Sequence, residues 1–224
     1  MQNTTTKRKN LATSNMVKIA LLSAISFVLT LPMFRWQLPI FPGFLQLDMS
    51  DVPAIVGLVA MGPIPAIWIA ALKNILDVAI TGTSSAGIGP FANFILSASY
   101  VLSMGYVIHR LKGTKGMIIG LVVATLFTTV VSAIFNYTIL IRAYAFVFGA
   151  EIDTFVAMAT AINPRITNFE SFIALSIAPF NILKFGLASI VFMLLYLAIG
   201  DYIKPSPKKQ STQIEIKTEK GELK

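Results

Sequence analysis

An asparagine and a lysine lie three residues apart inside the otherwise apolar stretch "IAPFNILKFG", residues 177–186. At about 100° per residue, Asn181 and Lys184 share one face of a helix, and Ile177 continues that face as an apolar surface. An amide and an ammonium group beside an apolar wall form the kind of polar patch that binds a small organic molecule. Since polar groups are costly to bury in lipid, this pair is a candidate functional site.

The chain around this pair has the composition of an integral membrane protein. Only 12% of its residues are charged and 55% are hydrophobic, with a mean hydropathy of +0.75, whereas a soluble domain carries about 25% charged residues. The chain has no cysteine, which excludes disulfides and cysteine-ligated metals. Its net charge of +8 comes from basic residues between and beyond the apolar stretches, a pattern that does not favour nucleic-acid binding.

Apolar stretches of the length that a bilayer requires occupy residues 16–34, 91–109, 116–140 and 170–200. A further stretch, 52–81, is too long for one ordinary span. It is interrupted at Gly62 and Pro63, where a proline would end a helix. This region therefore predicts a short second helix that turns at Gly62 and Pro63 into a third helix.

The positions of the basic residues predict the topology. They form three clusters. The first lies before or at the start of the first stretch (Lys7, Arg8, Lys9 and Lys18), the second follows residue 109 (Arg110, Lys112 and Lys115), and the third follows the last stretch (Lys204, Lys208 and Lys209). If all three clusters are cytoplasmic, as the positive-inside rule requires, the region 52–81 must cross the membrane twice. The sequence therefore predicts an all-α integral membrane protein with six transmembrane helices and both termini in the cytoplasm.

This topology divides the chain into three parts and defines its external segments. We expect a basic cytoplasmic N-terminus at 1–15, a six-helix transmembrane domain at 16–201 and a disordered cytoplasmic tail at 202–224. The expected external segments are 35–51, 82–90 and 141–169. The first of them, between helices 1 and 2, contains aromatic residues, prolines and aspartates, and we expect it to fold back as a lid.

The other polar residues within apolar stretches have structural alternatives. Lys73 and Asp77 are four residues apart and predict an intrahelical ion pair beside Asn74. Lys184 could instead pair with Asp77 or with backbone carbonyls freed by Pro179, and the asparagines could simply join helices. Known phosphate-loop, zinc-protease and serine-hydrolase motifs are missing from the sequence, which favours binding over catalysis.

Several segments, in this order, resemble one transporter family: "LQLDMSDVPAIVG", "MGPIPA", "LKNIL", "GIGPFANF", "FNYTILIRAY" and "APFNILK". From about residue 16 to about residue 200 the chain is similar to the riboflavin-specific S component, the substrate-binding membrane subunit, of energy-coupling factor (ECF) transporters. The resemblance implies a non-enzymatic six-helix protein of a bacterial cell membrane that takes up riboflavin through an outward-opening pocket. The implied partners are a transmembrane coupling protein and two cytoplasmic ATPases, and no cofactor or metal is implied.

The resemblance also implies roles for particular residues. Asn136, Asn181 and Lys184 match the polar ligands of the vitamin, with Asn93 as a further ligand. The lid segment that closes over the site matches Leu45, Gln46, Leu47 and Asp48. Ala20 and Ala24, whose spacing lets another helix approach closely, match the face that meets the coupling protein.

The sequence departs from the family's pattern in two places. Ile141, Arg142, Ala143 and Tyr144 stand where the family has a proline, and Phe185 separates Lys184 from the expected glycine. These departures concern the outer rim of the pocket and leave Asn136, Asn181 and Lys184 in place.

Three alternatives to the riboflavin-specific S component remain open. They are an S component for another vitamin such as thiamine or a pyridoxine-like compound, a structural six-helix protein, and an intramembrane enzyme that uses Lys184 or Asp77.

Overall fold

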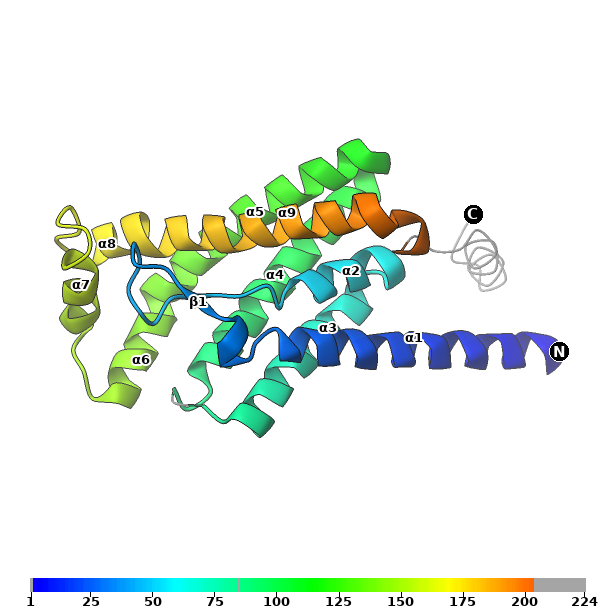
Figure 1. The fold of residues 1–224 in the computed structure, drawn as a ribbon, viewed down its shortest axis with the longest axis horizontal. Coiled ribbons are helices and arrows are strands. Elements are labelled where there is room, and N and C mark those ends of the chain that lie inside the picture. The colour runs from blue at the N-terminus through cyan, green and yellow to red at the C-terminus, as the bar shows by residue number, and fades with distance from the viewer. Residues whose placement is uncertain (1, 84, 204–224) are drawn as a thin grey trace.

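The structure is a computed structural model that describes residues 2–83 and 85–203, and it consists mainly of helices (Figure 1). The α-helices are α1 (Gln2–Val28), α2 (Val52–Met61), α3 (Pro63–Leu76), α4 (Ile88–Arg110), α5 (Gly113–Phe135), α6 (Ile141–Phe148), α7 (Ile152–Thr160), α8 (Phe169–Phe172) and α9 (Ala178–Ile203). Three π-helical segments interrupt or extend them: Asp77–Thr81, Asn136–Leu140 and Ile173–Ile177. Two short antiparallel strands, β1 (Trp36–Gln37) and β2 (Gln46–Leu47), follow a 3-10 turn at Pro32–Phe34.

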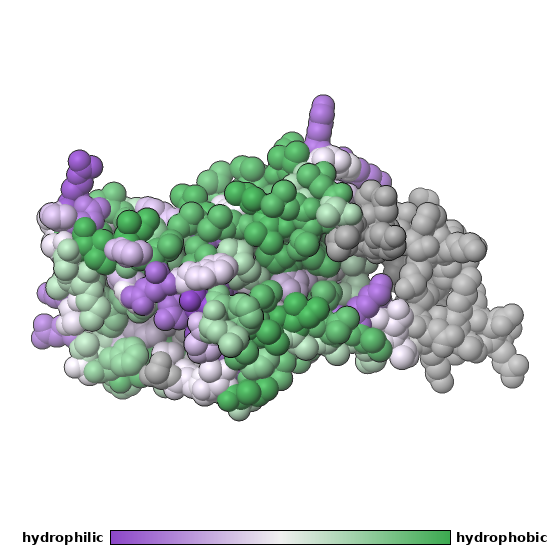
Figure 2. Space-filling model, in the orientation of Figure 1, coloured by the Kyte–Doolittle hydropathy of each residue, from purple (hydrophilic) through white to green (hydrophobic). Residues whose placement is uncertain are grey.

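Four helical runs within the described residues are long and apolar enough to cross a membrane: Pro63–Thr81, Ile88–Arg110, Gly113–Phe148 and Phe169–Ala198. Two further apolar helices, Thr13–Val28 and Val52–Met61, are shorter. Large hydrophobic side chains such as Leu126, Phe127 and Ile134 are exposed, and hydrophobic residues cover much of the face seen in Figure 2. Exposed apolar surface of this extent is what lipid-facing helices present.

The predicted turn at Gly62 and Pro63 is confirmed. Helix α2 ends at Met61 and α3 begins at Pro63, where the missing amide hydrogen costs nothing because the first helical position has no acceptor. Gly62 between them has a φ of 100°, a left-handed conformation that favours glycine. The two helices pack against each other through many contacts.

Two predicted helix ends were wrong. The first helix ends at Val28 and not at 34, because Leu31 precedes a proline and its ψ of 149° is extended. The helix predicted at 116–140 continues as a π-helical segment and then as α6 to Phe148. Consequently, the segment 141–169 is largely helical. Residues 204–224 of the predicted tail lie outside the described residues.

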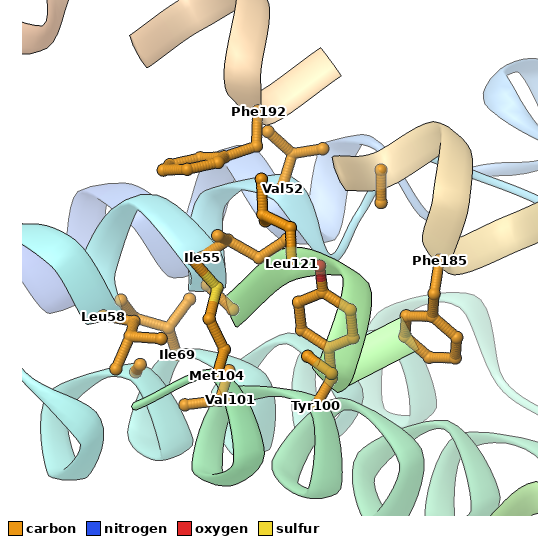
Figure 3. Packing of buried hydrophobic residues seen from close by; sticks show 14 of the residues in the cluster. Val52, Ile55, Leu58, Ile69, Tyr100, Val101, Met104, Leu121, Phe185 and Phe192 are labelled. Carbon is orange, nitrogen blue, oxygen red and sulfur yellow. The ribbon is translucent and has the colours of Figure 1, made fainter. Parts of the chain in front are cut away.

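The main hydrophobic core lies between α2, α3, α4, α5 and α9 (Figure 3). It explains Phe185, one of the departures from the family's pattern. The Phe185 side chain is fully buried, and its ring stacks on that of Tyr100 with centroids 5.2 Å apart and planes 15° apart. The Tyr100 hydroxyl in turn meets Ser189 Oγ at 2.6 Å. Phe185 therefore fixes α9 against α4 one residue beyond Lys184.

Candidate functional site

A cavity of about 550 Å³ opens among the β1–β2 segment, α4, α5, α6 and α9, within the size range of small-molecule sites. Most of the predicted site residues line it: Leu45, Gln46, Asp48, Asn93, Asn136, Asn181 and Lys184. Its apolar walls include Phe44, Phe155 and Phe180. Residues far apart in the sequence thus contribute one mixed polar and aromatic surface.

Leu47 lies elsewhere. In a strand, successive side chains point to opposite faces, so Leu47 is buried where Gln46 is exposed. Leu47 packs in a cluster with Phe41 and Phe180, whose rings meet edge to face with centroids 5.4 Å apart. This cluster fixes the β2 strand over α9, so the residue supports the cavity wall from behind.

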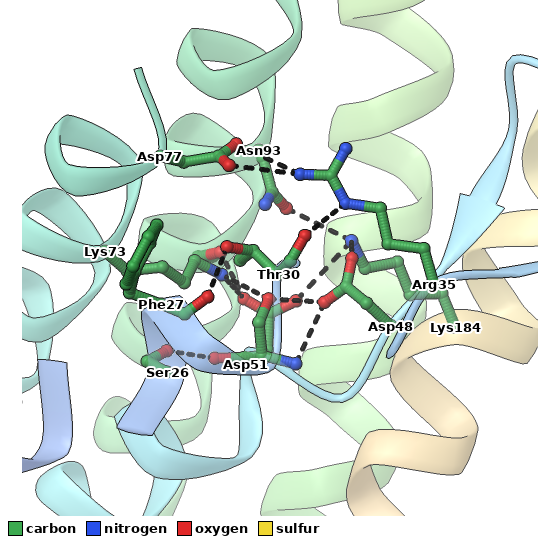
Figure 4. A network of polar contacts seen from close by, with 12 residues as sticks. Ser26, Phe27, Thr30, Arg35, Asp48, Asp51, Lys73, Asp77, Asn93 and Lys184 are labelled. Carbon is green, nitrogen blue, oxygen red and sulfur yellow. Dashed lines mark hydrogen bonds and ion pairs between the residues drawn. The ribbon is translucent and has the colours of Figure 1, made fainter. Parts of the chain in front are cut away.

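Lys184 connects α9 to the segment between β2 and α2 (Figure 4). Its Nζ donates to Asp48 Oδ2 at 3.3 Å and to Asn93 Oδ1 at 3.1 Å, and lies 3.8 Å from Asp51 Oδ2. The alternative in which Lys184 pairs with Asp77 is therefore wrong. Because Asp48 is itself one of the predicted lid residues, this ion pair holds the end of the segment 45–48 against α9.

The predicted intrahelical pair between Lys73 and Asp77 is also wrong. Lys73 is fully buried and donates to Asp51 Oδ1 at 2.7 Å and to Ser50 Oγ at 3.0 Å. Asp77 accepts from Arg35, whose Nη2 lies 3.1 and 3.2 Å from its two carboxylate oxygens. Each of the two charges is therefore neutralised by a side chain from another segment.

The Asp48 carboxylate is held in its charged form. Burial by itself would raise the pKa of Asp48, but the ammonium groups of Lys184 and Lys73 outweigh that effect and lower the pKa below its ordinary value. The backbone amide of Ser50 donates to Asp48 Oδ1 at 2.9 Å.

Within the described residues, no group of three or more His, Asp or Glu side chains could hold a metal ion.

The two asparagines have their amides aligned by their own helices. Asn136 Nδ2 donates to the Ser132 carbonyl, and Asn181 Nδ2 donates to the Ile177 carbonyl, both at 2.8 Å. Neither amide oxygen has a hydrogen-bond partner among the described residues, so both can accept from a ligand. Each asparagine lies at or within one turn of a π-helical segment, a distortion that is frequent at functional sites.

Sequence reasoning missed several cavity residues. Arg35 and Tyr144 line the cavity, as does Asp77, which was not among the residues predicted to bind the vitamin. The sequence offered one signal for Arg35, which is a charged residue directly after the first apolar stretch, 16–34. Arg142, from the segment that departs from the family's pattern, is exposed.

Ala20 and Ala24 lie on an exposed face of α1. Large apolar neighbours on the same helix, Leu21 and Ile25, are exposed as well. The two alanines therefore belong to a surface and contribute nothing to the cavity.

The model of the family "ECF transporter, substrate-specific component" matches residues 14–196. The chain belongs to this family. The solved structure of the S component of a bacterial ECF transporter superposes on it with a TM-score of 0.68 at 33% identity, covering 86% of this chain and 99% of the other. This S component thus has the family's helical membrane fold.

Curated relatives of this S component are riboflavin transporters. The riboflavin transporter RibU of Staphylococcus aureus is 35% identical over 84% of this chain and 92% of its own length. The riboflavin transporter FmnP of Bacillus subtilis is 31% identical over 84% of this chain and 93% of its own length. RibU of Streptococcus thermophilus is 27% identical over 82% of each chain.

Proposed function

We propose that this S component captures riboflavin and takes it up through an ATP-driven ECF transporter. The observation that carries this proposal is the convergence of Asn136, Asn181 and Lys184 on one cavity beneath the segment that contains Asp48. These are the residues that the family resemblance assigns to the vitamin. The names of the relatives support the choice of riboflavin over thiamine or a pyridoxine-like vitamin.

The chemistry of the cavity suits this ligand. Riboflavin presents a flat ring system with carbonyl and imide groups at one edge, and a ribityl chain of hydroxyls. Aromatic walls from Phe44, Phe155 and Phe180 suit the ring, while the free amide oxygens of Asn136 and Asn181 suit its polar hydrogens. Because riboflavin is uncharged near neutral pH, Lys184 acts toward it as a hydrogen-bond donor.

The same proposal includes the topology. We infer six crossings of a bacterial cell membrane: four by the long apolar helices and two by the shorter helices Thr13–Val28 and Val52–Met61. Both termini then lie in the cytoplasm with the basic clusters, and residues 35–51 form an external lid. The boundaries remain 1–15 for the N-terminus, 16–201 for the transmembrane domain and 202–224 for the tail.

The energy for transport is proposed to come from partner subunits that hydrolyse ATP. The sequence contains no phosphate-loop motif, so ATP hydrolysis by that mechanism belongs to separate subunits. The proposed partners are a transmembrane coupling protein and two cytoplasmic ATPases, with riboflavin as transported ligand and no cofactor.

Riboflavin titration of the purified protein in detergent tests the ligand. We expect saturable quenching of flavin fluorescence, because aromatic walls surround the ring, and no competition by a hundredfold excess of thiamine or pyridoxine. Unquenched riboflavin fluorescence, or displacement of riboflavin by either competitor, would reject the assignment.

Uptake by α1 variants tests the coupling face. We expect Ala20→Trp or Ala24→Trp to lower riboflavin uptake severalfold while riboflavin affinity stays unchanged, because a large side chain blocks close helix approach. Val130→Trp, at an exposed position on α5, is the matched control and should transport normally. Normal uptake in both alanine variants would place the partner surface elsewhere.

A further inference from the structure

The charged side chains that line the cavity balance one another. Among the described residues they are two cations, Arg35 and Lys184, and two carboxylates, Asp48 and Asp77. Each cation is paired with one of the carboxylates, Lys184 with Asp48 and Arg35 with Asp77. Behind the lining, Lys73 and Asp51 form a further balanced pair, so the cavity has no surplus charge.

Arg35 is the lining cation with the more accessible side chain. The exposed fraction of its side chain is 29%, against 10% for Lys184. Its Nη2 bonds to both oxygens of Asp77, and its Nε donates to the Thr30 carbonyl. The remaining nitrogen, Nη1, has no partner among the described residues and is free to donate to a ligand (Figure 4). A guanidinium group in such a position is a natural phosphate-binding group.

We propose that Asp77 is a specificity-determining residue, which neutralises Arg35 so that the cavity prefers uncharged riboflavin to its anionic 5′-phosphate. A phosphate group in the cavity loses its hydration, and every lining cation already has a carboxylate partner. The Asp77 carboxylate also repels the phosphate directly, which is discrimination by an unfavourable contact. This inference rests on the proposed function.

The test measures the affinities for riboflavin and for riboflavin 5′-phosphate by flavin fluorescence quenching. Asp77→Asn keeps the side-chain shape and a hydrogen-bond acceptor for Arg35 but leaves the guanidinium charge unbalanced. We expect the affinity for the phosphate, relative to that for riboflavin, to rise about tenfold, because the Coulomb attraction is strong at a low effective dielectric constant. Arg35→Gln leaves Asp77 unbalanced and should shift the same ratio in the opposite direction.

The double variant Arg35→Gln/Asp77→Asn restores neutrality and should return the ratio close to that of the unmodified protein. A ratio unchanged in the single variants would overturn the role of Asp77. If Asp77→Asn does not fold, Arg35→Gln still tests the proposal. An unchanged ratio of the two affinities in Arg35→Gln would also overturn the role of Asp77. Absence of riboflavin binding to the unmodified protein would instead defeat the proposed function, so the two failures are distinguishable.

Discussion

Lys184→Met is expected to weaken riboflavin binding by about 10- to 150-fold, the loss that follows from removing a charge-assisted hydrogen bond of about 1.5–3 kcal/mol. It should also lower the unfolding temperature. Lys184 is buried and paired with Asp48, and removing one partner of a buried ion pair leaves the other charge uncompensated. Fluorescence titration and thermal unfolding in detergent measure the two effects.

A double variant separates the two roles of Lys184. Adding Asp48→Asn to Lys184→Met removes the orphaned carboxylate, so stability should largely recover while riboflavin affinity stays low. Recovery of affinity in the double variant would show that Lys184 only holds the lid segment and does not contact the vitamin. The single variant Asp48→Asn completes the double-mutant cycle.

Lys73→Met is expected to destabilise the protein by about 3–5 kcal/mol, the usual cost of breaking a buried ion pair. Its ammonium group is fully buried, 2.7 Å from Asp51 Oδ1 and 3.0 Å from Ser50 Oγ. The free energy of unfolding, followed by helical circular dichroism in denaturant, measures the loss.

The matched control is Lys115→Met on α5, where the lysine is exposed and replacement should change stability by less than about 0.5 kcal/mol. Adding Asp51→Asn to Lys73→Met should recover part of the lost stability. A Lys73→Met variant as stable as the control would mean that the buried pair contributes no net stability.

Helical periodicity sufficed to predict which residues face the cavity within one helix. Asn181 and Lys184 lie on the same face at three-residue spacing, and that spacing placed both in the lining. The break at Gly62 and Pro63 was equally local, because one proline and one glycine determine it.

The partners of the charges could not be predicted in this way. Lys73 and Asp77 have the spacing of an intrahelical pair, yet each is neutralised by a side chain more than twenty residues away. The three π-helical segments and the stacking of Phe185 on Tyr100 likewise depend on how helices pack. Such contacts arise from tertiary structure, for which a single sequence carries no local signal.

Asp51 lies between the two buried lysines, 2.7 Å from Lys73 and 3.8 Å from Lys184. Because one carboxylate serves both the bundle interior and the cavity, the effects of substitutions at these three positions should not add. We therefore expect vitamin affinity and fold stability to be thermodynamically coupled in this protein. As related sequences diverge, we expect Asp51, Lys73 and Lys184 to change together, whereas exposed residues can change one at a time.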